Sequence, residues 1–124
     1  IPEITLVGCW AHARRNFMDA FKSIPSDAKK DTTPTTTEEG LAFCNKLFEI
    51  ERELRNLSDE ERYEGRLKKS APLLEDFKAW LKYQKRRVLP KSLLGKAITY
   101  CLNQWKKRIA FFLDGRLEIV PLIN

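Results

Sequence analysis

Apolar residues recur along most of this chain with the period of an α-helix. The exception is its start, where the apolar run at 4–7 has the β-branched content of a buried strand, and we predict a short core-type strand over residues 1–9. Helical spacing then predicts a first helix over residues 10–24. Prolines, threonines and few apolar residues at 25–37 predict a flexible loop.

Residues 38–116 carry the pattern of a helical bundle. The first helix of this region has apolar residues at alternating spacings of four and three, as in a coiled-coil seam: Phe43, Leu47, Ile50, Leu54 and Leu57. Ser58 followed by Glu61 predicts a capping box that starts the next helical stretch. Pro72 permits a break or a fresh start within that stretch.

The last helix is predicted to begin after Ser92, which suits an N-cap, and to end near Gly115. Its apolar face is formed by Leu94, Ile98, Cys101, Trp105, Ile109 and Phe112. Residues 117–124 follow as an atypical tail. The pattern therefore predicts one mainly α domain over residues 1–124, with one short N-terminal strand followed by about four helices.

The composition is that of a globular protein. Of 124 residues, 43% are hydrophobic and 32% are charged, so the chain can form a core of its own. No apolar run approaches the roughly 20 residues that cross a bilayer, and we expect no membrane partner. The odd set of Cys9, Cys44 and Cys101 does not suit a disulfide framework, which predicts reduced thiols in a cytoplasm.

The net charge of +6 is spread unevenly. Residues 26–61 hold ten acids and five bases, a net of −5, whereas residues 62–91 hold ten bases and three acids, a net of +7. Residues 92–116 add five bases and one acid, a net of +4. Bases gathered on one side attract the DNA backbone, although such runs also simply solvate helix faces.

The most distinctive stretch lies where the predicted strand meets the first helix. It contains the only histidine, one of three cysteines and one of three tryptophans: Gly8-Cys9-Trp10-Ala11-His12-Ala13-Arg14-Arg15-Asn16-Phe17. This run resembles transposases of the insertion-sequence 66 family, bacterial DNA-moving enzymes with a ribonuclease-H-like core. Two further blocks agree in order and approximate spacing: Leu89–Tyr100 followed by Asn103-Gln104-Trp105, and Asp114–Ile119. The resemblance spans nearly the whole chain.

The chain departs from the family pattern at the catalytic acids. In the family, the segment like 115–119 leads into Asp-Asn-Asn and the third acid, whereas here Val120 to Asn124 follow. The two earlier catalytic aspartates would lie before Ile1. We therefore expect no catalytic residue in this chain, no Mg²⁺ bound by it, and a fragment consisting of the last core strand and the helical insertion before the catalytic glutamate.

Cys9 and His12 have the spacing of half a zinc site. Zinc needs four ligands, or three and water, and Cys44 and Cys101 are isolated in the sequence, so we expect no metal. A thiol nucleophile is also disfavoured, because no orienting Asn or Asp is identifiable. We predict a structural role for five residues of the motif blocks: Cys9, Trp10, His12, Phe17 and Trp105. The resemblance to transposases favours a structural or DNA-positioning role for the pair of Cys9 and His12, with His12 orienting rather than transferring protons.

The candidate DNA contacts are basic residues on two helices: Arg14, Arg15, Lys82, Lys85, Arg86 and Arg87. Each has a structural alternative. Arg14 and Arg15 suit surface ion pairs, and the second cluster opposes the negative end of a helix dipole. We predict weak, non-specific DNA binding by a transposase fragment. The rivals are a stand-alone helical nucleic-acid-binding protein and an interaction module that self-associates through the coiled-coil-like seam.

Overall fold

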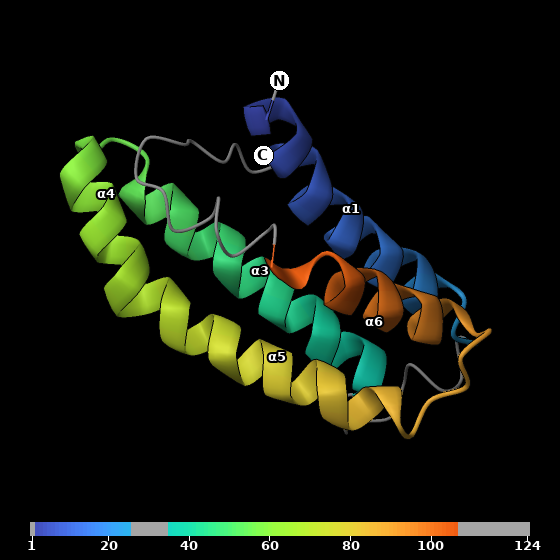
Figure 1. Cartoon of the computed structure of the whole chain (residues 1–124). Helices are drawn as coiled ribbons and strands as arrows, with labels where there is room; N and C mark the ends of the chain where they lie inside the picture. Colours follow the sequence, from blue (N-terminus) through green and yellow to red (C-terminus); the bar gives the residue numbers. More distant parts are fainter. Residues whose placement is uncertain (1, 26–34, 107–124) are drawn as a thin grey trace.

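Four helical rods form the structure (Figure 1). The computed structural model describes residues 2–25 and 35–106, with side chains from residue 10 onward in the first segment. The rods are α1 (Pro2–Lys22), α3 (Thr36–Leu54), a continuous rod of α4 (Asp59–Gly65), the π-helical turn η1 (Arg66–Ser70) and α5 (Ala71–Lys85), and α6 (Leu93–Asn103). The predicted mainly helical class is confirmed.

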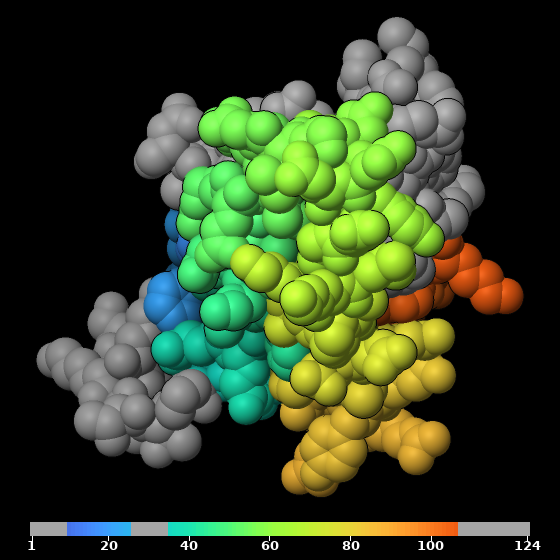
Figure 2. All heavy atoms as spheres, turned by 90° about the vertical axis from the view of Figure 1, so that its left-hand side faces the viewer, coloured from blue at the N-terminus to red at the C-terminus, as the bar shows by residue number. Residues whose placement is uncertain are grey.

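The rods pack in a ring. Helix α1 contacts α3 on one side and α6 on the other, and α5 contacts both α6 and α3. Figure 2 shows the outer side of the pair formed by α3 and the α4–η1–α5 rod, whose atoms lie directly against one another. Each rod therefore buries one stripe of side chains and leaves the rest exposed, as amphipathic helices do.

The prediction of an N-terminal strand is wrong. The described residues contain no strand, and the backbone of residues 2–9 continues α1, so the first helix begins at Pro2 instead of residue 10. A lone strand leaves its N–H and C=O groups unpaired, and the described part of the chain offers no second strand to satisfy them. A helix satisfies these groups internally, and proline suits its first position.

The helix starts follow the capping chemistry read from the sequence. Ser58 and Glu61 form the predicted capping box, and the Ser58 backbone N–H, with its hydroxyl, lowers the pKa of the Glu61 carboxyl by hydrogen bonding. Ser92 caps α6 as predicted, because its hydroxyl accepts from the Gly95 N–H at 3.0 Å. A further box at Thr35 starts α3 at Thr36, inside the predicted loop.

Several predicted segments lie outside the described residues. They are residues 26–34 of the loop, the end of the last helix with Ile109, Phe112 and Gly115, and the 117–124 tail.

The rod does not break at Pro72. One π-helical turn precedes it instead, in which the Ala71 N–H donates to the Arg66 carbonyl five residues back. Buried residues recur at every fourth position through this part of the rod, at Arg62, Arg66, Ser70 and Leu74. Such a spacing drifts by about 40° per turn in an α-helix, and a wider turn compensates for the drift.

The core is centred on Phe77 of α5, which is fully buried. Its ring stacks on Phe43 of α3 with centroids 4.8 Å apart, meets Trp105 edge to face at 5.7 Å, and lies 6.3 Å from Phe17 of α1. Trp10 adds an edge-to-face contact with Trp105 at 6.1 Å. Aromatic contacts of this kind contribute beyond their buried area, so Phe77 joins all four rods.

A buried ion pair joins α3 to the π-helical turn. Arg66 Nε and Nη2 donate to the two carboxylate oxygens of Glu51 at 3.0 and 2.7 Å, and both side chains are almost fully buried. The neighbouring pair of Lys69 and Glu53 has the same 3.0 Å reach, but both of its side chains are half exposed. Burial makes the first pair the costlier one to break, because a lone charge would remain without water.

We therefore expect Glu51→Ala to lower the free energy of unfolding by about 3–5 kcal/mol. Glu53→Ala removes the same group from the exposed pair and is expected to cost no more than about 1 kcal/mol. Urea unfolding followed by circular dichroism measures both. Glu51→Leu combined with Arg66→Met should recover most of the loss, since neither charge then remains buried. Equal losses in the two single variants would contradict a desolvated pair.

Candidate nucleic-acid interface

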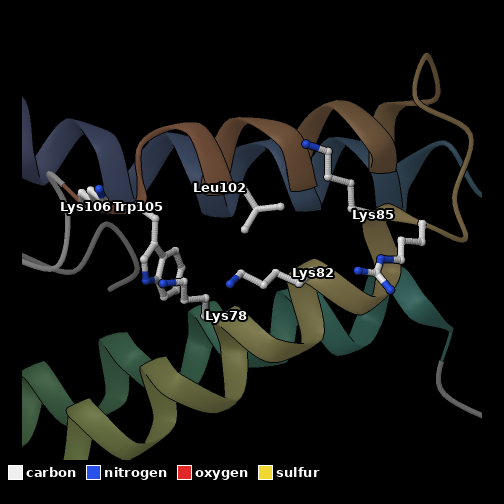
Figure 3. A pocket seen from close by; sticks show the side chains of 7 residues that line it. Lys78, Lys82, Lys85, Leu102, Trp105 and Lys106 are labelled. Carbon is white, nitrogen blue, oxygen red and sulfur yellow. The ribbon is translucent and has the colours of Figure 1, made fainter.

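A groove of about 590 Å³ lies between α5 and α6 (Figure 3). Lys78, Lys82 and Lys85 extend from α5 into the space beside α6, and Leu102 and Trp105 extend into it from the opposite side. Arg86 and Lys106 complete the lining. The groove is therefore a cationic channel with an apolar wall.

The three lysines share a face because of their spacing. Positions 78, 82 and 85 are four and three residues apart, which places them on one side of a helix. That side borders the buried stripe containing Leu74 and Leu81. Lysine suits this border, since its aliphatic stem covers apolar surface while its ammonium stays in water.

Trp105 forms part of the wall and is held in place. It is only 6% exposed, and the rings of Trp10 and Phe77 both meet it edge to face. So little of its indole faces the groove that stacking on a base is not its role. Its contribution is to fix the position of the α6 end against α5.

The groove carries an uncompensated positive charge. Five cations line it and no acid does, and the sequence has no Asp or Glu between Phe77 and Lys106. The ion pairs within the described part of the chain lie outside the groove. They join Arg62 to Asp59, Arg66 to Glu51 and Lys69 to Glu53. Like charges in a concave site reinforce one another's potential, so this groove attracts an anion or a polyanion.

The structure brings together half of the predicted DNA contacts. Lys82, Lys85 and Arg86 line the groove, whereas the guanidinium of Arg87 lies over the Tyr83 ring, 5.2 Å from its centroid. That position is a cation–π contact on the outside of α5.

Arg14 and Arg15 lie on a different side of the bundle. Arg14 Nε donates to Asn45 Oδ1 of α3 at 2.8 Å, which places it over the seam of α1 and α3. The groove lies at the opposite seam of the ring, between α5 and α6. Arg15 is exposed on α1.

Sequence reasoning did not select Lys78, Leu102 or Lys106. The 78–82–85 spacing was a readable signal for Lys78, because it continues the face of two selected lysines. Leu102 and Lys106 belong to α6 and its end, and only the packing of α6 on α5 brings them to the groove.

The motif residues divide between core and surface. Trp10, Phe17 and Trp105 are buried, while His12 is exposed and packs edge-on to Tyr100 with centroids 6.1 Å apart. The Cys9 side chain lies outside the described part of the chain. Within that part, the side chains of Cys44 and Cys101 are buried, and no three His, Cys, Asp or Glu residues gather closely enough to hold a metal ion.

The absence of zinc at Cys9 and His12 stays a prediction. Protein purified without chelator should contain well under one zinc per chain by elemental analysis, because two ligands alone hold zinc weakly. About one zinc per chain in the parent, lost in Cys9→Ser, would overturn the structural interpretation of this pair.

Fold and groove define a helical bundle with a cationic channel suited to a polyanion. No helix in the described ranges has the length and apolar character to cross a membrane. The sequence profile described as "Transposase IS66 family" matches residues 1–120. The chain therefore belongs to the transposase IS66 family.

Three relatives from Sinorhizobium fredii cover almost all of this chain. The uncharacterized proteins y4jD and y4hP are each 35% identical to it, over 116 and 118 residues, and y4qI is 36% identical over 117 residues. The matches cover 92–94% of this chain but only 20–21% of the relatives. The chain thus spans about a fifth of the length of the relatives it matches. No solved structure matches it.

Proposed function

We propose that this domain binds the phosphate backbone of DNA through the α5–α6 groove, as a non-catalytic helical part of a transposase. One observation carries the proposal: five cations line the groove without an acid. Because the chain belongs to a transposase family, DNA is the polyanion that we propose as the ligand. The corresponding setting is the bacterial cytoplasm, in which cysteine thiols are kept reduced.

The spacing of the cations suits a nucleic-acid strand. Seven residues separate Lys78 from Lys85, a rise of about 10 Å along α5. Phosphates of one strand advance by about 3.4 Å per base pair along the duplex axis, so this length covers about three steps. Arg86 and Lys106 add two further cations to the lining of the groove.

Nothing in the groove favours one base sequence over another. Lysine ammonium groups are point charges that neutralise phosphates, and reading a base edge takes a bidentate group directed into a DNA groove. We therefore expect binding in the range of about 10⁻⁴–10⁻⁶ M at physiological salt, without sequence preference.

Removing the groove charges should weaken DNA binding and flatten its salt dependence. We expect the triple variant Lys82→Gln, Lys85→Gln, Arg86→Gln to lower the slope of log K against log salt by up to about 2.7, since each phosphate contact contributes about 0.9. All three side chains are exposed, so folding should persist. Fluorescence anisotropy of a labelled duplex across a salt series measures the slope.

The matched control changes three exposed bases on α3 and at its C-cap, Lys46, Arg52 and Arg55, to Gln, with the same loss of charge. Arg14→Gln with Arg15→Gln tests the α1 candidates separately. Both variants should keep nearly the parent slope, because their side chains do not line the groove. If the slope fell equally in the groove and α3 variants, DNA binding would depend on net charge alone, which would contradict the proposal.

We further propose that this chain alone does not cut DNA. None of its residues matches the three family acids, and a single carboxylate such as Glu118 cannot hold two metal ions. The described residues supply no cluster fit for Mg²⁺, and we assign them no chemical step. Incubation of the purified chain with supercoiled plasmid and Mg²⁺ or Mn²⁺ should leave the plasmid intact. Nicking that disappears in Glu118→Ala would show catalytic competence.

The packing weakens the interaction-module rival. The coiled-coil-like seam is used inside the bundle, where Leu47 is 2% exposed and Leu54 is 3% exposed. Only Leu57 at its end is exposed, at 37%. Salt-insensitive self-association without DNA binding would nonetheless favour this rival, whereas salt-sensitive DNA binding supports either a transposase part or a stand-alone nucleic-acid-binding protein.

A further inference from the structure

The turn between α5 and α6 presents apolar side chains to solvent. Leu89 is 76% exposed, the highest value among the large apolar residues that the structure describes. Tyr83, 57% exposed, and Leu93, 47% exposed, flank it. Pro90, the next residue, is also exposed, and both residues belong to the turn that joins α5 to α6 at one end of the bundle (Figure 1), called the tip below. Burial of this leucine against a partner would remove its apolar surface from water, which is favourable.

The backbone under Leu89 is held firmly. Its carbonyl accepts hydrogen bonds from the Ser92 backbone N–H at 3.1 Å and from the Ser92 hydroxyl at 2.6 Å. The same carbonyl lies so close to Gly95 that a Cβ on Gly95 would overlap it. The backbone of the tip is therefore pre-organised. Inserting the Leu89 side chain into a binding partner requires little further ordering of the backbone.

Positive charge surrounds the tip. Arg86, Arg87 and Lys91 are all exposed and lie within three residues of Leu89. The acids that open α3 are already engaged: Glu38 in its capping box, and Glu39 as the acceptor of the Trp80 indole N–H at 3.4 Å. An apolar side chain surrounded by basic ones is complementary to a DNA duplex, in which two phosphate backbones flank a stack of apolar base faces.

We propose that Leu89, backed by Pro90, is a wedge that inserts between adjacent base pairs from the minor groove while the surrounding bases hold the flanking phosphates. Leucine and proline are among the side chains that unstack a base step in this way and kink the duplex. The inference rests on the proposed DNA binding, because Arg86 belongs to both the groove and the turn. A duplex bound in the groove therefore passes the tip.

A duplex containing 2-aminopurine tests the wedge, since this base fluoresces more strongly when it is unstacked. We expect the parent chain to raise the fluorescence at saturation and Leu89→Ala to return it to the level of free duplex. The affinity, measured separately by anisotropy, should change by less than about tenfold in Leu89→Ala, because the phosphate contacts remain. Leu89→Phe should keep the signal, since phenylalanine also acts as a wedge.

The matched control is Leu67→Ala, which truncates a leucine of the π-helical turn that is 43% exposed and far from the tip. It should leave the fluorescence and the affinity unchanged. Binding by the parent without any rise in fluorescence would overturn the wedge and leave groove binding intact. No binding at low salt would overturn both. Unchanged fluorescence in Leu89→Ala, with lost self-association by sedimentation velocity, would make the tip a protein contact instead.

Discussion

The packing of the Phe77 ring is the constraint on which the rest of the molecule depends. This one side chain meets an aromatic ring from each of the other three rods: Phe17, Phe43 and Trp105. Close-packed rings tolerate little rotation of the helices that carry them. The rotation of α5 is thereby fixed, and Lys78, the next residue along, is directed to the side where α6 lies. The core and the charged groove are consequences of the same packing.

The sequence pattern predicts features that depend on neighbouring residues in the chain. It does not predict features that depend on contacts between distant segments. The Ser58 and Ser92 caps and the apolar faces follow from spacing and side-chain chemistry alone, and the structure contains them. The apolar run near the N-terminus indicated a strand, but a strand depends on a neighbour that local pattern does not report. The groove likewise needed the packing of α6, which adds Lys106 and could not be found from the α5 lysines.

The bundle corresponds to about a fifth of the length of the relatives that the chain matches. The groove between α5 and α6 gathers five cations and no acid, so it supplies electrostatic attraction without reactive groups. Attraction of this kind speeds encounter with a polyanion and leaves specificity to other contacts.

The π-helical turn limits the changes in length that the α4–η1–α5 rod tolerates. It is equivalent to one residue inserted into an otherwise α-helical rod, and each such residue rotates everything downstream by about 100°. Deleting one residue between Arg66 and Ser70 would restore a regular helix, yet would leave either Arg66 or Phe77 facing solvent. The number of residues between the buried ion pair and the aromatic core is therefore fixed.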